Sequence, residues 1–394
     1  MTASATTVNW PLRTPPADYV LGHVRAVLPD RILDDARVVV RDGTIAAVEP
    51  HPAGSASDVD GSGMYCLPGI VDVHSDALEK ERMPRPSAQL PWEFALLSFE
   101  AKLRAAGVTT VFHGACFEHT TSRGLERSIE LADELCAAVD ARGPAPVDHR
   151  ILHRLDVRSE VGAQRLRARL ETSTRITELV SHEDHTPGQG QYVDRGYLEE
   201  YLTGADGLSP ERAREHVDEL IESRAAALPV RDANLRWLGG LAASGRIRLA
   251  GHDPADAGEI AELRARGGAV AEFPTTRAAA AAAAQNGLPV VMGAPNVLRG
   301  TSHAGNVSAR DLIAAGLVAA LASDYLPSGL LAAAFLLAES IGLPAAAGLI
   351  TAGPAQVAGL ADRGRLEPGL RADLTLVEAG PRWPIVRAAL RAES

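Results

Sequence analysis

Two side chains that commonly bind metals, His74 and Asp76, lie two residues apart in the sequence. Ile70, Val71 and Val73 precede them, a pattern that predicts a buried strand. Side chains at positions i and i+2 of a strand point to the same face, so both could reach one cation at the carboxyl end of that strand. A His-x-Asp pair is common, so by itself it is weak evidence for a metal site. Similar side chains at other strand ends would strengthen that evidence.

A cationic segment follows this pair directly, with Lys80, Arg82 and Arg85 interrupted by prolines. Of the 39 basic residues only two, Lys80 and Lys102, are lysines. The compact charge of an ammonium group suits phosphate, whereas Lys102 lies in an amphipathic segment typical of a solvated helix. Metal ligands beside fixed cations indicate metal-assisted attack on an anionic, phosphorylated substrate.

Further acidic and imidazole side chains end later apolar segments. They are Asp156, then His182, Glu183, Asp184 and His185, then His252 and Asp253, and finally Asp324. Each of them alone could be a turn or capping residue, and Asp324 could cap the helix that follows it. Together they predict a site at one end of a barrel.

The elements that must position these side chains alternate regularly along the chain. Strands are predicted near 70–73, 108–112, 150–156, 176–182, 247–251, 268–272, 289–292 and 318–323. Helices are predicted near 92–106, 122–142, 159–171, 208–226, 229–244, 255–266, 275–285 and 308–316. Eight strand–helix units predict an α/β protein with a TIM-type (β/α)8 barrel, whose active residues lie where the strands end.

The two ends of the chain have a different pattern. Residues 18–66 contain short alternating runs separated by turn signals, and residues 364–377 read as a turn followed by a strand. We expect these ends to form one small β-sandwich domain, from residues 1–66 and 357–394. The barrel would then occupy residues 67–356.

Composition excludes several classes of partner. The formal net charge of −11 without a basic tail argues against nucleic acid or an anionic membrane surface. The apolar segment 312–360 is too often interrupted to span a membrane, and the N-terminus lacks a signal-peptide pattern. Cys66, Cys116 and Cys136 form no CxxC motif. We expect a cytoplasmic enzyme with a small-molecule substrate, which could form a homo-oligomer.

Several motifs resemble a known superfamily. PGIVDVHSD and ALASDYLPS resemble the amidohydrolase superfamily, whose barrels bind one or two divalent metals. A narrower resemblance spans residues 18–377 and includes HSDALEKERMPRP, DHTPGQGQY, GHDPADA, EFPTT, MGAPNVLRGTSHAGNVSA and SDYLPS. These motifs resemble the PhnM family, the α-D-ribose 1-methylphosphonate 5-triphosphate diphosphatases of the carbon–phosphorus lyase pathway.

The resemblance implies a set of metal ligands. His74 and Asp76 would be ligands on the first strand, His185 and His252 later imidazole ligands, and Asp324 the last-strand ligand and general base. The implied cofactor is one or two ions of Zn²⁺, Mn²⁺ or Mg²⁺. The carboxylate of Asp76, where the superfamily usually has a second histidine, favours Mn²⁺ or Mg²⁺ somewhat.

The number of metal ions depends on a bridging ligand. Many superfamily members use a carboxylated lysine on a mid-barrel strand, and neither lysine of this chain lies on one. A binuclear site would need Asp156, the first choice, or Glu183; otherwise the site is mononuclear. His185 and His252 fall on predicted strands four and five, one strand earlier than usual, so either a strand is missing from the prediction or the layout differs.

A second candidate for anion binding is the glycine-rich loop 292–309, with Arg299, His303 and Asn306 as donors. With Lys80, Arg82 and Arg85, these residues would bind phosphate oxygens. The implied reaction is hydrolysis of α-D-ribose 1-methylphosphonate 5-triphosphate to the 5-phosphate and pyrophosphate, in phosphonate catabolism. One alternative is hydrolysis of an amide, imide or deaminable ring, which needs no cationic cluster. Another is a non-catalytic barrel in a pathway complex, which the complete ligand set argues against.

Overall fold

Eight parallel strands form the centre of the molecule. The computed structural model describes residues 14–85, 87–118, 120–122, 125–173, 177–188, 195–205, 207–302 and 305–392. The central strands are β6 (Ile70–Ser75), β7 (Val108–Phe117), β10 (Asp148–Asp156), β11 (Glu178–Glu183), β12 (Ile247–His252), β13 (Val270–Glu272), β14 (Val290–Gly293) and β15 (Ala320–Ala322). They are hydrogen-bonded in this order, and each coincides with a predicted strand.

Backbone hydrogen bonds bring the first and last strands together. The peptide N–H of Asp324, just after β15, donates to the carbonyl of His74 at 2.9 Å, and the N–H of Asp76 donates to the carbonyl of Asp324 at 2.7 Å. Ser75 and Asp324 form an isolated parallel bridge. The sheet is therefore a nearly closed (β/α)8 barrel, as predicted.

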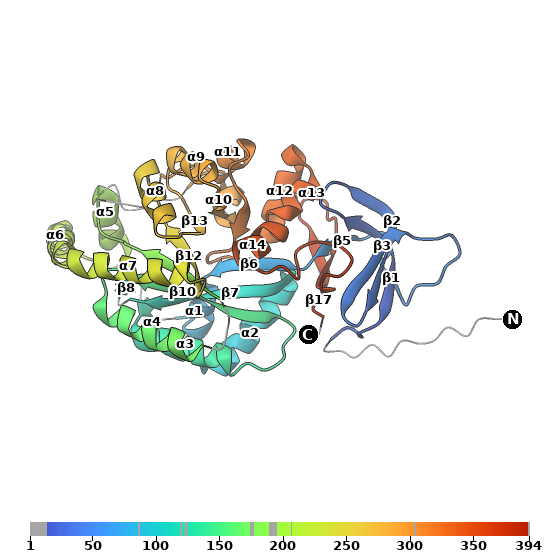
Figure 1. Cartoon of the computed structure of the whole chain (residues 1–394), viewed down its shortest axis with the longest axis horizontal. Coiled ribbons are helices and arrows are strands. Elements are labelled where there is room, and N and C mark those ends of the chain that lie inside the picture. Colours follow the sequence, from blue (N-terminus) through green and yellow to red (C-terminus); the bar gives the residue numbers. More distant parts are fainter. Residues whose placement is uncertain are drawn as a thin grey trace.

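The predicted helices are present, and all but the one over residues 210–226 lie around the barrel (Figure 1). They are α2 (Trp92–Ala105), α3 (Ile129–Asp140), α4 (Glu160–Thr172), α6 (Pro210–Ala226), α7 (Leu228–Ala243), α8 (Ala257–Ala265), α9 (Arg277–Gln285) and α11 (Ala309–Ala314). Hydroxyl and carboxylate side chains cap several of their first turns, namely Ser128, Ser159, Ser209, Asp256, Thr276 and Ser308.

The prediction missed some elements. The helix expected from residue 122 begins only at Ile129, because β8 (Thr120–Ser122) and β9 (Leu125–Arg127) form a hairpin before it. The helices α1 (Ala77–Arg82), α5 (Arg195–Ala205), α10 (Ala294–Arg299), α12 (Gly329–Ile341), α13 (Leu343–Gly348) and α14 (Ala352–Val357) were not predicted. Within the described ranges, no helix combines the length and the apolar composition that a membrane span requires.

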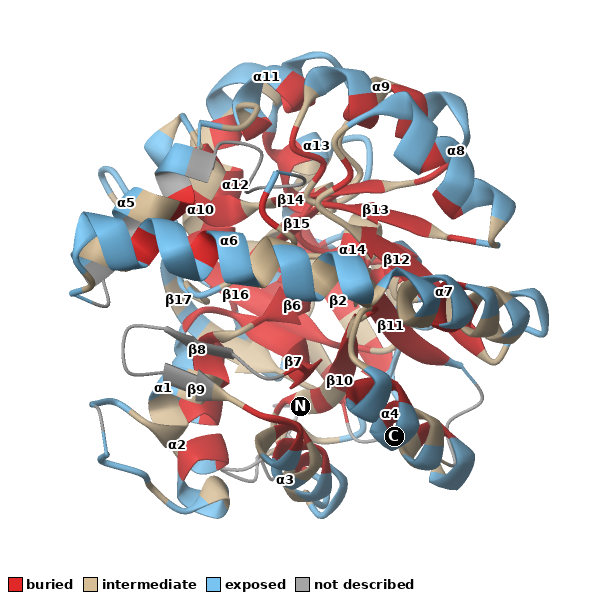
Figure 2. Cartoon of the chain, turned by 90° about the vertical axis from the view of Figure 1, so that its left-hand side faces the viewer, coloured by how far each residue is buried: buried red, intermediate tan, exposed pale blue. Residues whose placement is uncertain are grey.

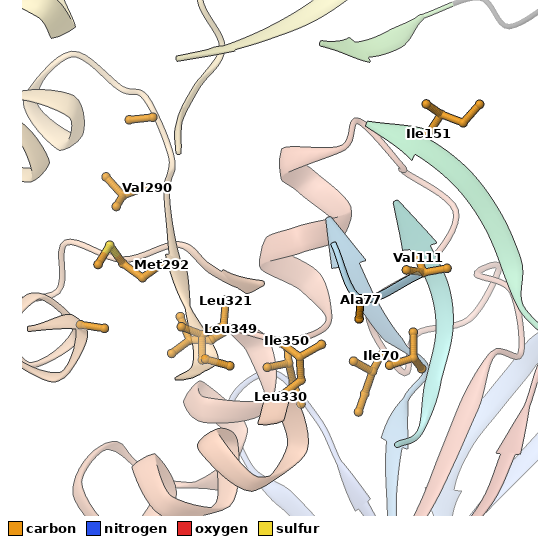
Figure 3. Close-up of a cluster of buried hydrophobic side chains, with 14 of the residues drawn as sticks. Ile70, Ala77, Val111, Ile151, Val290, Met292, Leu321, Leu330, Leu349 and Ile350 are labelled. Carbon is orange, nitrogen blue, oxygen red and sulfur yellow. The ribbon is translucent and has the colours of Figure 1, made fainter. Parts of the chain in front are cut away.

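Burial explains the apolar character of the barrel strands. Figure 2 shows the strands buried, whereas the helices expose their outer faces. All ten residues of β7 are buried, as expected for a parallel strand that is covered on both faces. Figure 3 shows part of the layer between strands and helices, with Ile70, Val111, Ile151, Val290 and Leu321 from the strands, and Leu330 and Ile350 beyond them. A second apolar cluster, including Val71, Phe112, Leu152 and Val291, fills the barrel interior.

The two ends of the chain form a separate sheet beside the barrel (Figure 1). Its strands are β1 (Tyr19–Val27), β2 (Ile32–Arg41), β3 (Thr44–Pro50), β4 (Val59–Asp60), β5 (Tyr65–Pro68), β16 (Leu374–Glu378) and β17 (Ile385–Leu390). The order is β17-β16-β5-β1-β2-β3, with β4 on β1. An isolated bridge between Thr44 and Arg371 brings the β2–β3 turn to the segment before β16, so the sheet curls around its own core. The domain boundaries at residues 66/67 and 356/357 remain a prediction.

Candidate metal centre

Five of the six predicted metal ligands lie together at the carboxyl end of the barrel, namely His74, Asp76, His185, His252 and Asp324. Their ligand atoms belong to linked groups in which all atoms lie within 4.8 Å of one another. The groups are His74–Asp76–Asp324, His74–His252–Glu272, His185–His252–Asp253 and Glu118–Glu183–His185. Each group shares a histidine with the next, so the donors form one continuous cluster.

Closure of the barrel places Asp324 beside the first-strand pair. The two backbone hydrogen bonds that join Asp324 to His74 and Asp76 hold its peptide in a left-handed conformation, with φ at 58°. Aspartate adopts this region more readily than most residues, because its short side chain can hydrogen-bond locally. Three ligand-type side chains from opposite ends of the barrel sequence are therefore fixed relative to one another by main-chain contacts.

Glu272, at the end of β13, orients two of the imidazoles. Its two oxygens accept hydrogen bonds from Nδ1 of His74 and Nδ1 of His252, both at 2.8 Å. Ser181 donates a third hydrogen bond to the same carboxylate at 2.6 Å. Because a carboxylate only accepts, Nδ1 carries the proton in each ring, and Nε2 is left as the metal-binding atom of the neutral form.

Sequence reasoning did not assign Glu272 this role, although the signal was present. The residue begins the EFPTT motif and ends the predicted strand 268–272. With 3% of its surface exposed, a glutamate at that position needs partners to compensate its charge. Strand periodicity cannot name those partners, since they come from the first and fifth barrel strands.

Charge coupling within the cluster is strong. Burial disfavours the imidazolium form of His74, but the carboxylates of Glu272 and Asp76 outweigh it and raise its pKa well above the usual value. His252 is also buried, and the carboxylates of Asp253, Glu183 and Glu272 raise its pKa to about 9. Burial and the neighbouring Asp76 carboxylate raise the pKa of Asp324. The carboxylates around His74 and His252 therefore favour a positive charge at these rings, either a proton or a metal ion.

Two carboxylate oxygens point toward the metal-binding atoms of these histidines. Oδ1 of Asp76 lies 3.5 Å from Nε2 of His74, and Oδ2 of Asp253 lies 3.5 Å from Nε2 of His252. Both oxygens are buried and accept no hydrogen bond from the part of the chain that the structure describes. Buried, unpaired carboxylate oxygens beside imidazole nitrogens form a mixed N/O donor set that fits a divalent metal.

The two candidate bridging carboxylates have different surroundings. Glu183, the second choice, lies at the end of β11 within the cluster, with one oxygen bonded to Nε of Arg154 and the other 3.9 Å from Nδ1 of His185. Asp156, the first choice, lies outside every donor group, and both of its oxygens accept hydrogen bonds from Arg224 at 2.9 Å. The geometry therefore does not support Asp156 as a metal ligand.

All eight predicted strands are present, so no missed strand explains the positions of the later histidines. His185 follows the fourth barrel strand and His252 ends the fifth. The segment that carries His185 is held by Asp184, whose carboxylate accepts hydrogen bonds from Arg158 at 2.9 Å and from Arg224 at 3.0 Å. The predicted ligand layout thus differs from the one expected for the superfamily.

Two of the predicted phosphate-binding cations meet at one aromatic residue, Tyr325, which directly follows Asp324. The Lys80 ammonium lies 5.4 Å from the centre of the Tyr325 ring, and Arg299 donates a hydrogen bond to the Tyr325 hydroxyl. Lys80 comes from α1 and Arg299 from the end of α10, so two helices meet at the loop that follows β15. Tyr325 itself was not predicted as a site residue.

The remaining predicted cations lie elsewhere. The Arg82 guanidinium stacks over Trp92 at 5.2 Å and lies 3.7 Å from Glu134, on the side of α2 and α3. Arg85 is exposed after α1, and Asn306 is half-buried before α11. His303 lies outside the described residues. Of the predicted cations, Lys80 and Arg299 thus contact the residue that directly follows Asp324, whereas Arg82 contacts Trp92 and Glu134.

Comparisons with known proteins agree with this architecture. The chain is 35% identical over 366 residues to the α-D-ribose 1-methylphosphonate 5-triphosphate diphosphatase of Escherichia coli (strain K12), covering 91% of this chain and 94% of that protein. An imidazolonepropionase of Deinococcus radiodurans is 28% identical over 376 residues, covering 89% of this chain and 87% of its own. No protein-family model matches the chain.

Solved structures extend the likeness to the fold. An amidohydrolase matches with a TM-score of 0.55 and 16% identity, covering 95% of this chain and 99% of its own. A D-hydantoinase matches with a TM-score of 0.54 and 12% identity, covering 91% and 86%. At these identities the structural matches support the fold alone.

Proposed function

Because the chain belongs to the amidohydrolase superfamily and, within it, to the family of the α-D-ribose 1-methylphosphonate 5-triphosphate diphosphatase, we propose that it is a metal-dependent hydrolase that cleaves the 5-triphosphate of that compound. The products are the 5-phosphate and pyrophosphate. The observation that carries this proposal is the position of Lys80 and Arg299 around Tyr325, next to Asp324. Cations at that position suit a polyphosphate, whereas a neutral ring needs none.

The metal would be held by His74, Asp76, His185, His252 and Asp324, with Glu272 orienting the two imidazoles that it contacts. Zn²⁺, Mn²⁺ and Mg²⁺ all remain candidates for this mixed donor set. A divalent ion bound there lowers the pKa of water and polarises a phosphoryl oxygen. The shared Glu272 carboxylate holds both rings in the tautomer that leaves Nε2 available.

Asp324 is the proposed general base. Its pKa is raised by burial and by the Asp76 carboxylate, which brings it closer to the pH at which the enzyme would work. The carboxylate takes the proton of the attacking water and then returns it to the leaving oxygen. Its left-handed backbone and its two peptide hydrogen bonds hold it in place during both transfers.

Lys80 and Arg299 are proposed to bind the phosphate oxygens that leave as pyrophosphate. The two cations contact different parts of Tyr325, Lys80 the ring and Arg299 the hydroxyl. Tyr325 is 37% exposed, which leaves this corner of the site accessible from outside. Binding charge at the leaving group stabilises the transition state as the phosphoanhydride breaks.

The proposal is tested by turnover of ribose 1-methylphosphonate 5-triphosphate beside ATP, in enzyme loaded separately with Zn²⁺, Mn²⁺ or Mg²⁺. Pyrophosphate and orthophosphate are followed independently. Pyrophosphate release from the ribosyl substrate, with little from ATP, is the expected result. No release from either substrate by a metal-loaded protein would refute the proposal.

A second candidate function is hydrolysis of an amide-type bond in a ring. The 28% identity to imidazolonepropionases favours it, since it extends over 89% of this chain. Release of a ring-opened carboxylate from a panel of imidazolones and hydantoins, without phosphate chemistry, would favour this alternative. The cations around Tyr325 would then be a surface feature. A cytoplasmic location and a homo-oligomeric state remain predictions.

A further inference from the structure

A buried arginine lies between two carboxylates of the candidate metal centre. Arg154, on β10, is 4% exposed, and its guanidinium links two carboxylates of the candidate centre. One terminal nitrogen donates to Oδ2 of Asp76 at 2.5 Å, and Nε donates to Oε1 of Glu183. The first-strand ligand and the fourth-strand carboxylate are thus joined by an organic cation.

The neighbouring strand makes room for this arginine. Gly114, on the neighbouring strand β7, pairs with Leu152, two residues before Arg154. A Cβ atom on Gly114 would be 3.1 Å from Cδ of Arg154 and 2.4 Å from Oδ1 of Asp76. A second cation reinforces the arrangement, because Arg127 donates to Oδ2 of Asp76 at 3.0 Å and to Glu79 at 3.0 Å. The contacts leave Oδ1 of Asp76 directed toward His74.

The electrostatic consequence is strong. Both carboxylates are buried, which by itself would raise their pKa values. Several positive charges together outweigh burial. Arg154, His252 and His185 lower the pKa of Glu183 to about 2. Arg154, Arg127 and His74 lower the pKa of Asp76 well below its usual value. What sets Arg154 apart from the other positive groups is that it contacts both carboxylates directly.

The same contacts restrict what Glu183 can do. A carboxylate that bridges two metals in the common way uses one oxygen for each, and Oε1 of Glu183 is already engaged by Arg154. The remaining oxygen lies near His185, and Glu183 shares no donor group with His74, Asp76 or Asp324. In this arrangement Glu183 does not join the group of His74, Asp76 and Asp324 to the group that contains His185.

We propose that Arg154 is a built-in cation that takes the place of the second, bridged metal, so that each chain binds one divalent ion tightly and Glu183 does not bridge a metal pair. This inference rests on the metal dependence that we propose above, but not on the choice of substrate. Arg154 acts through Asp76 and Glu183 and is therefore a positioning residue.

The first test uses the metal-stripped full chain titrated with Mn²⁺, without substrate. Equilibrium dialysis with elemental analysis gives the stoichiometry, and electron paramagnetic resonance shows whether two Mn²⁺ ions are exchange-coupled through a shared ligand. One tightly bound ion and an uncoupled spectrum are expected. Two ions per chain, or an exchange-coupled spectrum, would overturn the inference.

The second test changes the arginine itself. Arg154→Met removes the cation and frees Glu183, so the stoichiometry is expected to rise from one ion toward two. Arg154→Lys keeps the charge and is expected to stay at one ion. Arg150→Met is the matched control, because Arg150 lies at the other end of β10, where it pairs with Asp148. Unchanged stoichiometry in a folded Arg154→Met protein would contradict the proposed role.

The outcomes separate this inference from the proposed function. One bound ion without any triphosphate hydrolysis would refute the proposed substrate and leave the role of Arg154 standing. Two exchange-coupled ions together with rapid pyrophosphate release would support the proposed substrate and refute the role of Arg154. If Arg154→Met does not fold, as judged by circular dichroism, the wild-type spectrum and Arg154→Lys decide the question.

Discussion

Gly114 lies so close to Asp76 that a Cβ atom on the glycine would be 2.4 Å from Oδ1 of the carboxylate. Gly114 is in the middle of β7, where a glycine weakens a strand and therefore needs a reason. The reason is the candidate metal centre, since the missing side chain leaves space for Asp76 beside Arg154. A strand residue far from Asp76 in sequence thus sets the position of a proposed ligand.

Gly114→Ala should therefore displace Asp76 and weaken metal binding by about tenfold or more, in line with other changes around metal ligands. Overpacking should also lower the free energy of unfolding by about 1–3 kcal/mol. Isothermal titration with Mn²⁺ and urea denaturation measure the two effects. Gly240→Ala is the control, because a Cβ atom there meets nothing within 4 Å. Equal metal affinity in Gly114→Ala and wild type would contradict the argument.

Glu272→Gln should reduce metal affinity by about 10–100-fold, because one of the two imidazoles would face an amide nitrogen in place of a carboxylate oxygen. The change keeps the size of the side chain, so folding should be largely preserved. Competition with a chelator gives the metal affinity. Glu339→Gln, on the exposed face of α12, is a control for the loss of one negative charge. A metal affinity equal to that of the control variant would show that Glu272 does not support metal binding.

Asp324→Asn should lower kcat by about 10²–10⁴-fold, since an amide cannot accept the proton of the attacking water. Its effect on KM should be much smaller, because the phosphate-binding cations are unchanged. Steady-state kinetics over a range of pH separate the two constants. Loss of the acidic limb of the pH profile of the residual activity is also expected. Near-normal turnover by this variant would rule out Asp324 as the general base.

Lys80→Met should raise KM for the triphosphate by about tenfold, the value of one charge-assisted hydrogen bond. Tyr325→Phe should have a smaller effect of the same kind, because Arg299 loses the hydroxyl that positions it. Lys102→Met is the matched control, since Lys102 is the other lysine and pairs with Glu81 on the surface. Inhibition by pyrophosphate gives an independent measurement. Identical behaviour of Lys80→Met and Lys102→Met would exclude a phosphate contact by Lys80.

His153, on β10, should make stability depend on pH below neutrality. Burial lowers its pKa to about 4, compared with about 6.5 in the unfolded chain. The unfolded state therefore binds a proton first as the pH falls. Stability is fully present above pH of about 6.5 and is lost progressively down to pH of about 4, by about 3 kcal/mol in total.

His153→Gln removes this titration and can still donate to the carbonyl of Leu179, as Nδ1 of His153 does. Its free energy of unfolding should change less between pH 7 and pH 4.5 than that of the wild type. Urea denaturation at several pH values makes the comparison. Parallel curves for the two proteins would show that His153 is not responsible.

The barrel and its eight strands could be predicted because their signal is local. Mainly apolar segments, such as the one with Ile70, Val71 and Val73 and those before His252 and Asp324, must be buried on both faces. Residue type alone reveals this requirement. The start of α3 was misplaced for the opposite reason. The β8–β9 hairpin lies in a polar stretch whose residue types do not distinguish a short hairpin from a helical turn.

Candidate ligands could be identified in the same way, since a carboxylate or imidazole that ends a buried strand stands out. The strand-end pattern gave a longer list of candidates, and the resemblance to the superfamily selected His74, Asp76, His185, His252 and Asp324 from it. The structure brings these five together. It could not decide between Asp156 and Glu183. Both end apolar runs, and only the folded chain places Arg224 beside one and Arg154 beside the other.

By itself, then, the sequence determined which strands are buried and which side chains end them, because both depend on residues that are adjacent in the chain. The tertiary structure alone decided which charges meet. Glu272 accepts a hydrogen bond from His74, which is 198 positions away in the sequence. Arg154 donates one to Asp76, which is 78 positions away. Such pairs depend on the order in which the strands close the barrel, and the energy of a buried charge depends on its neighbours in space, which no local pattern contains.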